Sequence, residues 1–117
     1  MPSKDPVQRF QDILENRRIE GHTAGMNAAA FLEDHKTYDV VERCLERISE
    51  ASKKLGSLAE ELCPEIPWPT LRALGNFLRH EYDRVEGERL WFLVERDLAP
   101  LKAAAAAALQ RLGSPME

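Results

Sequence analysis

Apolar side chains recur at spacings of three and four along most of the 117-residue chain. This period places them on one face of a helix, whereas a half-buried strand would alternate apolar and polar residues. No segment alternates in that way. The pattern predicts helices from residue 6 to about 20, over 28–32, from 37 or 39 to 62, over 68–85, and from 88 to 112. We therefore expect an all-α fold, an up-and-down bundle of four long helices and one short helix, in a single domain spanning residues 1–117.

Local signals mark where these helices begin. Asp5 can cap the first helix, Pro6 suits its first position, and Gln8 occupies the place where a capping box has Glu or Gln. Asn27 can cap the short second helix in the same way. The third helix is expected to open at Thr37 or Asp39, after a polar break at residues 34–36.

Proline and glycine indicate where helices stop. Three prolines between residues 63 and 69 should end the long third helix and direct the next one, with Trp68 as a packing anchor at the corner. A short break is expected near Glu86 and Gly87. Pro100 should kink the last helix, which Gly113 then ends.

Composition narrows the class of protein. The chain is 44% hydrophobic, 31% charged and 7% aromatic, which is typical of a helix-rich domain with a core and argues against disorder. Its net charge of −4 means that any contact with nucleic acid would need a local basic patch. Cys44 and Cys63 are expected to be reduced thiols. The first residues lack an apolar segment, so no signal peptide is expected. No apolar run reaches the roughly 18 residues that span a membrane, and we therefore expect a cytoplasmic protein.

Residues 68–85 combine two kinds of side chain at helical spacing. One flank is apolar, and the other carries an unusual mixture of guanidinium, amide, imidazole and carboxylate groups, from Arg72, Asn76, Arg79, His80 and Asp83. An ordinary solvated helix face is the alternative interpretation of this flank. The mixture favours a functional site.

His80 is the centre of that candidate site. Asn76 lies one turn before it on the same side, and Arg79 is its neighbour in sequence. An imidazole beside guanidinium groups suits transfer at a phosphodiester, since the imidazole can take a proton from an attacking hydroxyl while the cations stabilise the charged phosphorus centre. The three histidines are scattered and no Cys-x2-Cys motif is present, so no metal and no other cofactor is expected.

Several segments together resemble the HepT-like family of HEPN-domain proteins. Residues 9–14 look like the opening helix of that family, 31–34 like its short second element, and 41–51 like its long helix. Residues 66–68 lead into the signature helix, and Leu90-Trp91 with residues 97–101 resembles the closing helix. The resemblance covers nearly the whole chain and implies a HEPN-like helical bundle.

The family hallmark is an arginine, four to six residues and then a histidine, often extended to His-x-Tyr. His80-Glu81-Tyr82 matches the extended end. An arginine is usual immediately before the asparagine, but this chain has Gly75 there. Arg72 and Arg79 are the remaining candidates, and Arg72 lies about 12 Å from His80 along a helix axis.

The resemblance implies a toxin of a two-component toxin–antitoxin pair whose partner is an MNT-type nucleotidyltransferase. Such proteins are metal-independent ribonucleases that act as homodimers, with the signature helices facing each other across a cleft. His80 would be the catalytic base, Arg79 and Arg72 would hold phosphate, and Asn76 and Asp83 would orient these groups. Tyr82 matches the tyrosine that the partner modifies with AMP.

Other interpretations stay open at this point. Tyr82 also lies on the apolar stripe and could be a core tyrosine. Gly75 and the acidic net charge favour a non-catalytic HEPN adaptor, which would bind a nucleotidyltransferase or a nucleotide without cutting RNA. A helical interaction bundle with no nucleotide chemistry is a third possibility.

Overall fold

Helices form almost all of the described chain. The computed structural model describes residues 5–78 and 84–113, with all side chains in this range except those of residues 17, 76–78 and 84–86. The helices are α1 (Pro6–Glu15), the 3-10 turn η1 (Asn16–Arg18), α2 (Ile19–Thr23), α3 (Ala28–Glu33), α4 (His35–Leu55), α5 (Ser57–Leu62), α6 (Trp68–Leu78), α7 (Arg84–Arg96) and α8 (Leu98–Arg111). No strand occurs among these residues, so the all-α prediction is confirmed.

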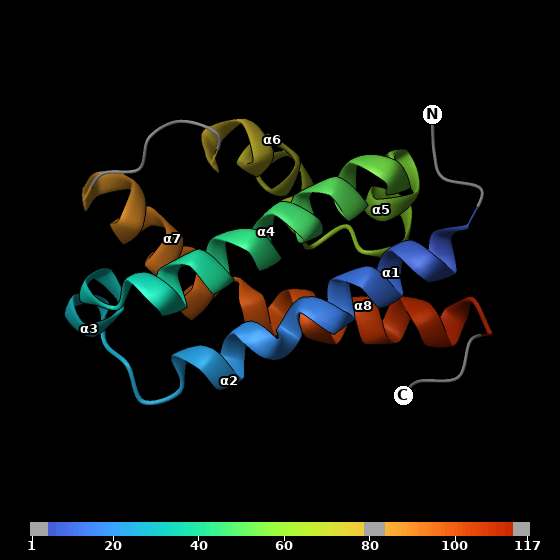
Figure 1. Ribbon diagram of the computed structural model, residues 1–117. Helices are drawn as coiled ribbons and strands as arrows, with labels where there is room; N and C mark the ends of the chain where they lie inside the picture. Colours follow the sequence, from blue (N-terminus) through green and yellow to red (C-terminus); the bar gives the residue numbers. More distant parts are fainter. Residues whose placement is uncertain (1–4, 79–83, 114–117) are drawn as a thin grey trace.

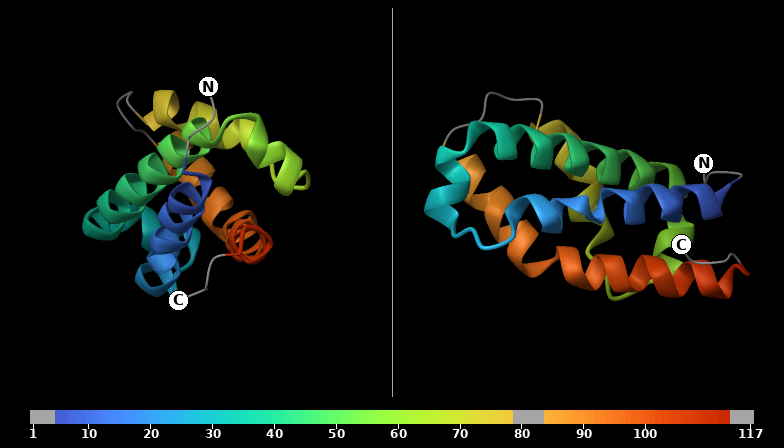
Figure 2. Two further views of the ribbon diagram at one scale, coloured as in Figure 1. Left: turned by 90° about the vertical axis from the view of Figure 1, so that its right-hand side faces the viewer. Right: turned by 60° about the horizontal axis from the view of Figure 1, so that its bottom comes forward.

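The long helix α4 lies at the centre of the bundle. It packs most extensively against α6 on one side and against α1 on the other, as Figure 1 shows. Helix α1 lies between α4 and α8, which the right-hand view of Figure 2 makes plain. The short α3 covers one end and packs against α7. The candidate helix α6 is therefore supported along its length by α4.

The expected caps are present at the first two helix starts. The Asp5 carboxylate accepts from the Gln8 backbone N–H at 3.0 Å, and the Asn27 side chain accepts from the Ala30 N–H at 2.8 Å. The side chain of Gln8 donates to Asp12 at 2.8 Å. Both caps follow from local sequence, because the donor and the acceptor are only three residues apart.

The start of α4 differs from the prediction. Asp34 caps this helix, accepting from the Thr37 backbone N–H at 3.0 Å and from its hydroxyl at 2.9 Å. The backbone hydrogen bond from Thr37, and after it the hydroxyl one, lowers the pKa of the Asp34 carboxyl. The helix therefore begins at His35. The polar break expected over residues 34–36 was therefore wrong, because Asp34 caps α4 and residues 35 and 36 belong to its first turn.

Gly56 divides the helix that was expected to run unbroken to residue 62. Its φ of 59° lies in the left-handed region that glycine tolerates without steric cost, and the backbone there separates α4 from α5. The apolar period continues across the division. The prediction of one helix was therefore wrong because the period alone does not detect a turn made by a single glycine.

Gly87 lies inside α7, so the break predicted near Glu86 and Gly87 was also wrong. A Cβ atom at this position would overlap Leu32 Cδ2 and would lie 3.3 Å from Tyr38 Cε2. The glycine therefore serves close packing of α7 on α3 and the start of α4.

The interruption in the last helical stretch falls at Asp97, between α7 and α8. Pro100 follows three residues later, in the first turn of α8. A proline ring conflicts with the carbonyl four residues before it, which here belongs to Arg96, the last residue of α7. The kink that Pro100 was expected to cause is thus a short break just before it.

The core joins all the layers of the bundle. Phe10, Phe31 and Trp68 are fully buried, and the Phe31 ring lies 5.3 Å from the ring centroids of both Tyr38 and Trp91. Within the described range, no helix is long and apolar enough to cross a membrane.

Both cysteines are buried and free, as expected. Burial raises the pKa of the Cys63 thiol, whose sulfur lies 3.5 Å from the Ala104 carbonyl oxygen. Among the described residues, no group of three or more His, Cys, Asp or Glu side chains is placed to hold a metal ion.

Candidate functional site

Ser49 fixes α4 to α6 at the middle of their interface. Its hydroxyl donates to the Arg72 carbonyl at 3.1 Å and accepts from the Gly75 backbone N–H at 3.1 Å. The residue is 1% exposed. A serine on a helix is usually solvent-exposed, but this one lies in the interior. Its hydroxyl is accepted in the interior because both of its contacts are to backbone groups of α6.

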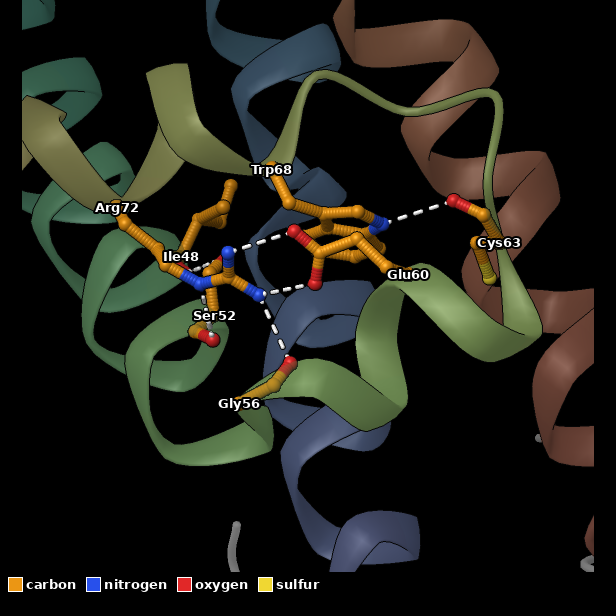
Figure 3. Close-up of polar contacts among 7 residues, drawn as sticks. All are labelled: Ile48, Ser52, Gly56, Glu60, Cys63, Trp68 and Arg72. Atoms are coloured by element: carbon orange, nitrogen blue, oxygen red, sulfur yellow. Dashed lines mark hydrogen bonds and ion pairs between the residues drawn. The ribbon is translucent and has the colours of Figure 1, made fainter. Parts of the chain in front are cut away.

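Arg72 is bound by its own chain, as Figure 3 shows. Its guanidinium forms a two-pronged contact with the Glu60 carboxylate, at 2.8 Å from Nη1 and 2.6 Å from Nη2. Nη2 also donates to the Gly56 carbonyl at 2.8 Å, and Nε donates to the Ser52 carbonyl at 3.3 Å. Arg72 therefore ties α6 to the corner where α4 ends and α5 begins.

Charge and hydrogen bonding at this corner reinforce each other. The hydrogen bond from Arg72 lowers the pKa of the Glu60 carboxyl, and the same contact raises the pKa of the Arg72 guanidinium. Paired guanidinium–carboxylate contacts fix orientation as well as charge. Arg72 is therefore held in a fixed orientation where α4, α5 and α6 meet.

Trp68 anchors the start of α6. The indole N–H donates to the Cys63 carbonyl at 2.8 Å, and the ring is fully buried (Figure 3). This contact spans the proline-rich corner and fixes the direction in which α6 leaves it. The expectation of a packing anchor at Trp68 is confirmed.

The remaining predicted site residues lie at or beyond the end of α6. Asn76 belongs to α6, although its side chain is outside the described ones. Arg79, His80, Tyr82 and Asp83 fall in residues 79–83, which lie outside the described residues. Their placement in one site stays a prediction.

A groove runs between α6 and α7, the two helices that flank residues 79–83 in the chain. It has a volume of about 870 Å³, and its lining comprises Pro69, Thr70, Ala73, Leu74, Glu88, Arg89, Leu90, Phe92, Leu93 and Asp97. Phe92 is 55% exposed, and the Arg96 guanidinium lies 5.2 Å from its ring centroid. Phe92 was not among the predicted site residues, although a large apolar side chain outside the apolar period of its helix is a usable signal.

Lys53 of α4 lies beside Gly75 of α6. It is exposed, but its ammonium lies against the backbone of α6 at Gly75. A Cβ atom at Gly75 would lie 3.2 Å from Lys53 Nζ and 3.3 Å from Ser49 Oγ. A side chain at Gly75 would therefore require small shifts of Lys53 and Ser49.

Comparison with known proteins identifies the family. The model of the family described as Ribonuclease HepT-like matches residues 13–108, which include the α4–α6 interface and the whole of the predicted site. The chain belongs to this family. The resemblance seen in the sequence is thereby confirmed.

Named relatives agree with this assignment. The chain is 38% identical over 95 residues to the Methanocaldococcus jannaschii protein named "Putative RNase MJ0127", covering 80% of this chain and 78% of the relative. It is 36% identical over 99 residues to the "Probable ribonuclease HepT" of Thermococcus cleftensis, covering 85% and 88% of the two chains. No solved structure gives a significant match.

Proposed function

We propose that the protein is a metal-independent endoribonuclease and the toxin of a HEPN/MNT toxin–antitoxin pair. The observation that carries this proposal is the match to a ribonuclease family over residues 13–108, a range that includes His80-Glu81-Tyr82. The ribonuclease names of two relatives that cover most of the chain support it.

In the proposed reaction, a ribose 2′-hydroxyl of RNA attacks the adjacent phosphate. His80 takes the proton from that hydroxyl, the bond between the 2′-oxygen and phosphorus forms, and the bond from phosphorus to the 5′-oxygen breaks. The leaving 5′-oxygen takes up a proton, which leaves a cyclic phosphate and a free 5′-hydroxyl. Arg79 stabilises the charge on phosphate, while Asn76 and Asp83 orient the reacting groups.

Arg72 has a different place in this proposal from the one its sequence position suggested. Its guanidinium already forms a two-pronged contact with Glu60 and donates to the Gly56 carbonyl. Releasing it toward a phosphate would leave that carboxylate and carbonyl without their partner. We therefore assign Arg72 to the support of α6, with phosphate left to other cations.

A homodimer would complete the site. The outward side of α6 carries the exposed residues Pro69, Thr70 and Ala73, which are small enough to let a second helix approach closely. The groove beside them continues to Phe92, a large exposed ring. Burying this surface against a second copy would bring the two signature helices together across the cleft.

The proposed antitoxin is an MNT-type nucleotidyltransferase, which would silence the site through Tyr82. The phenolic oxygen of Tyr82 would attack the α-phosphate of ATP, forming a phosphodiester to AMP and releasing pyrophosphate. The added phosphate would place a negative charge two residues from His80 and would repel RNA.

A non-catalytic adaptor is the second candidate function. Two observations favour it: glycine stands directly before Asn76, and the net charge is −4. In this alternative the dimer would bind the nucleotidyltransferase or a nucleotide and leave RNA intact.

Incubation of the purified protein with transfer and messenger RNA in the presence of a metal chelator separates the two functions. Cleavage supports the ribonuclease. Intact RNA, together with a stable complex between the protein and its co-expressed nucleotidyltransferase, would establish the adaptor instead. Intact-mass measurement of the co-expressed protein tests the modification, since added AMP should disappear in Tyr82→Phe.

A further inference from the structure

A polar hollow with a volume of about 310 Å³ lies between α1 and α4. The residues that decide its chemistry are Arg9, Asp12 and Asn16 from α1, and Arg47, Glu50 and Lys54 from α4. Its lining is described in full, and none of it belongs to the residues assigned above to RNA cleavage. The hollow therefore calls for an account of its own.

The two helices run in opposite directions, which decides how the lining residues face one another (Figure 1). Arg18, three residues after the end of α1, donates from Nε to the Cys44 sulfur at 3.4 Å. From this contact, a step back along α1 corresponds to a step forward along α4. Three levels follow: Asn16 with Arg47, Asp12 with Glu50, and Arg9 with Lys54.

A buried acceptor without a donor marks one end of the hollow. Asn16 is 4% exposed, and its Oδ1 has no hydrogen-bond partner among the described residues. The Asn16 Nδ2 donates to the Asp12 carbonyl at 2.7 Å, which fixes the orientation of the amide. Asn16 can therefore accept a hydrogen bond from a ligand but is not free to donate one. A ligand N–H would satisfy an atom that is otherwise costly to bury.

The other end of the hollow is cationic. Arg9 Nη1 lies 3.2 Å from the Asp12 carboxylate, while Arg9 Nε is buried without a partner among the described residues. The Asp12 carboxylate also accepts from Gln8 Nε2 at 2.8 Å, so both of its oxygens are occupied. Lys54 is exposed and, within residues 5–78 and 84–113, has neither a hydrogen bond nor an ion pair. This end can therefore bind an anionic group.

The groups between and beside these ends complete a pattern. Glu50 and Arg47 are exposed and unpaired among the described residues. A carboxylate can accept from ribose hydroxyls, and a guanidinium plane can stack on a nucleobase. Arg9 and Asn16 are seven positions apart, about 10 Å along the helix axis, so the two ends can hold opposite ends of one ligand. Glu15 also lines the hollow, next to Asn16 and away from the cationic end.

We propose that this hollow binds one nucleotide. Arg9 and Lys54 hold its phosphate, and Glu50 accepts from its ribose hydroxyls. The base stacks on Arg47 and donates to Asn16 Oδ1. Because Asn16 offers only an acceptor, the preferred base carries an exocyclic amino group, as adenine and cytosine do. The nucleotide is either free or one unit of an RNA strand, and the inference does not rest on the proposed ribonuclease activity.

Calorimetric titration with adenosine and inosine 5′-monophosphates tests the base contact. The two nucleotides differ at C6 of the base, where inosine lacks the amino group. The wild type should bind the adenosine nucleotide about tenfold more tightly, the loss expected for one unsatisfied hydrogen bond. This preference should disappear in Asn16→Ala. Equal affinity of the wild type for the two nucleotides would overturn the proposed base contact.

Exposed residues test the hollow without disturbing the core. Arg47→Ala and Lys54→Ala should each weaken binding of adenosine 5′-monophosphate about tenfold, through loss of stacking and of the phosphate contact respectively. Arg43→Ala and Lys53→Ala are the matched controls, since these neighbours do not line the hollow, and both should bind like the wild type. Thermal midpoints measured for all four variants exclude unfolding as the cause.

A 2′-O-methylated RNA oligonucleotide, which lacks the attacking hydroxyl, distinguishes the two sources of the nucleotide. If the hollow holds a unit of RNA, Lys54→Ala should weaken oligonucleotide binding relative to Lys53→Ala. If it holds a free nucleotide, only binding of adenosine 5′-monophosphate should weaken. Either result supports the inference. If neither affinity distinguishes Lys54→Ala from Lys53→Ala, the inference is overturned, whether or not the wild type cleaves RNA.

Discussion

Removing the Arg72 side chain should destabilise the fold strongly, even though the residue is only partly buried. Arg72→Ala deletes the two-pronged contact with Glu60 and the donors to the carbonyls of Gly56 and Ser52. The two charged side chains are 26% and 43% exposed, so water can replace part of their contact and we assign it about 1 kcal/mol. Each carbonyl that loses its donor adds about 1 kcal/mol. The expected loss is about 3 kcal/mol.

Chemical denaturation followed by circular dichroism at neutral pH measures this loss. In a domain of this size, a loss of about 3 kcal/mol in the free energy of unfolding corresponds to a fall in Tm of about 10 °C. Arg43→Ala is the control, because the Arg43 side chain is 67% exposed and its contact with Glu46 is long, at 3.9 Å. This variant should change the free energy of unfolding by less than about 0.5 kcal/mol. If Arg72→Ala is as stable as Arg43→Ala, the structural role given to Arg72 is incorrect.

Three further predictions concern Glu60, Gly87 and Phe92. The pKa of the Glu60 carboxyl is lowered in the folded state, so the wild type should be more stable than Glu60→Gln only where this carboxyl is ionised. The advantage should be complete above about pH 4.3, the pKa of an unfolded glutamate, and should be lost as the pH falls through the lowered pKa. Urea midpoints that differ equally at neutral and strongly acidic pH would contradict this. Gly87→Ala should lower the thermal midpoint despite the better helix propensity of alanine, because its Cβ would overlap Leu32. Gly21→Ala is the control: a Cβ there has no atom within 4 Å, so this variant should be neutral or stabilising by up to about 1 kcal/mol. Equal shifts of the thermal midpoint in the two variants would show that close packing at Gly87 is not the cause. Phe92→Asp should leave folding intact but convert a dimer to monomer in sedimentation velocity, and a mutant that sediments like a dimeric wild type would exclude Phe92 from the interface.

The parts of the fold that could be predicted depend on near neighbours in sequence. The caps at Asp5 and Asn27 join groups three residues apart, and the buried positions Val41, Cys44 and Ile48 follow the helical period. Such features need no knowledge of the partner helix.

The features that escaped prediction depend on what lies across an interface. Ser49 is polar yet buried, because α6 supplies two backbone partners for its hydroxyl. Gly87 was interpreted as a helix break, but it is required by the approach of Leu32. These contacts join residues 23 or more positions apart, and no local pattern encodes them.

The candidate site divides in the same way. His80 and Tyr82 could be proposed from the family resemblance, and their roles stay predictions. The pairing of Arg72 with Glu60 and the approach of Lys53 to Gly75 became visible only when α4 and α6 were placed together.

The rate of RNA cleavage by His80→Ala, measured in a metal chelator beside the wild type, tests the central claim most directly. The wild type should cleave, and His80→Ala at an equal thermal midpoint should show no cleavage above background. Cleavage by His80→Ala at the wild-type rate would contradict the proposed site.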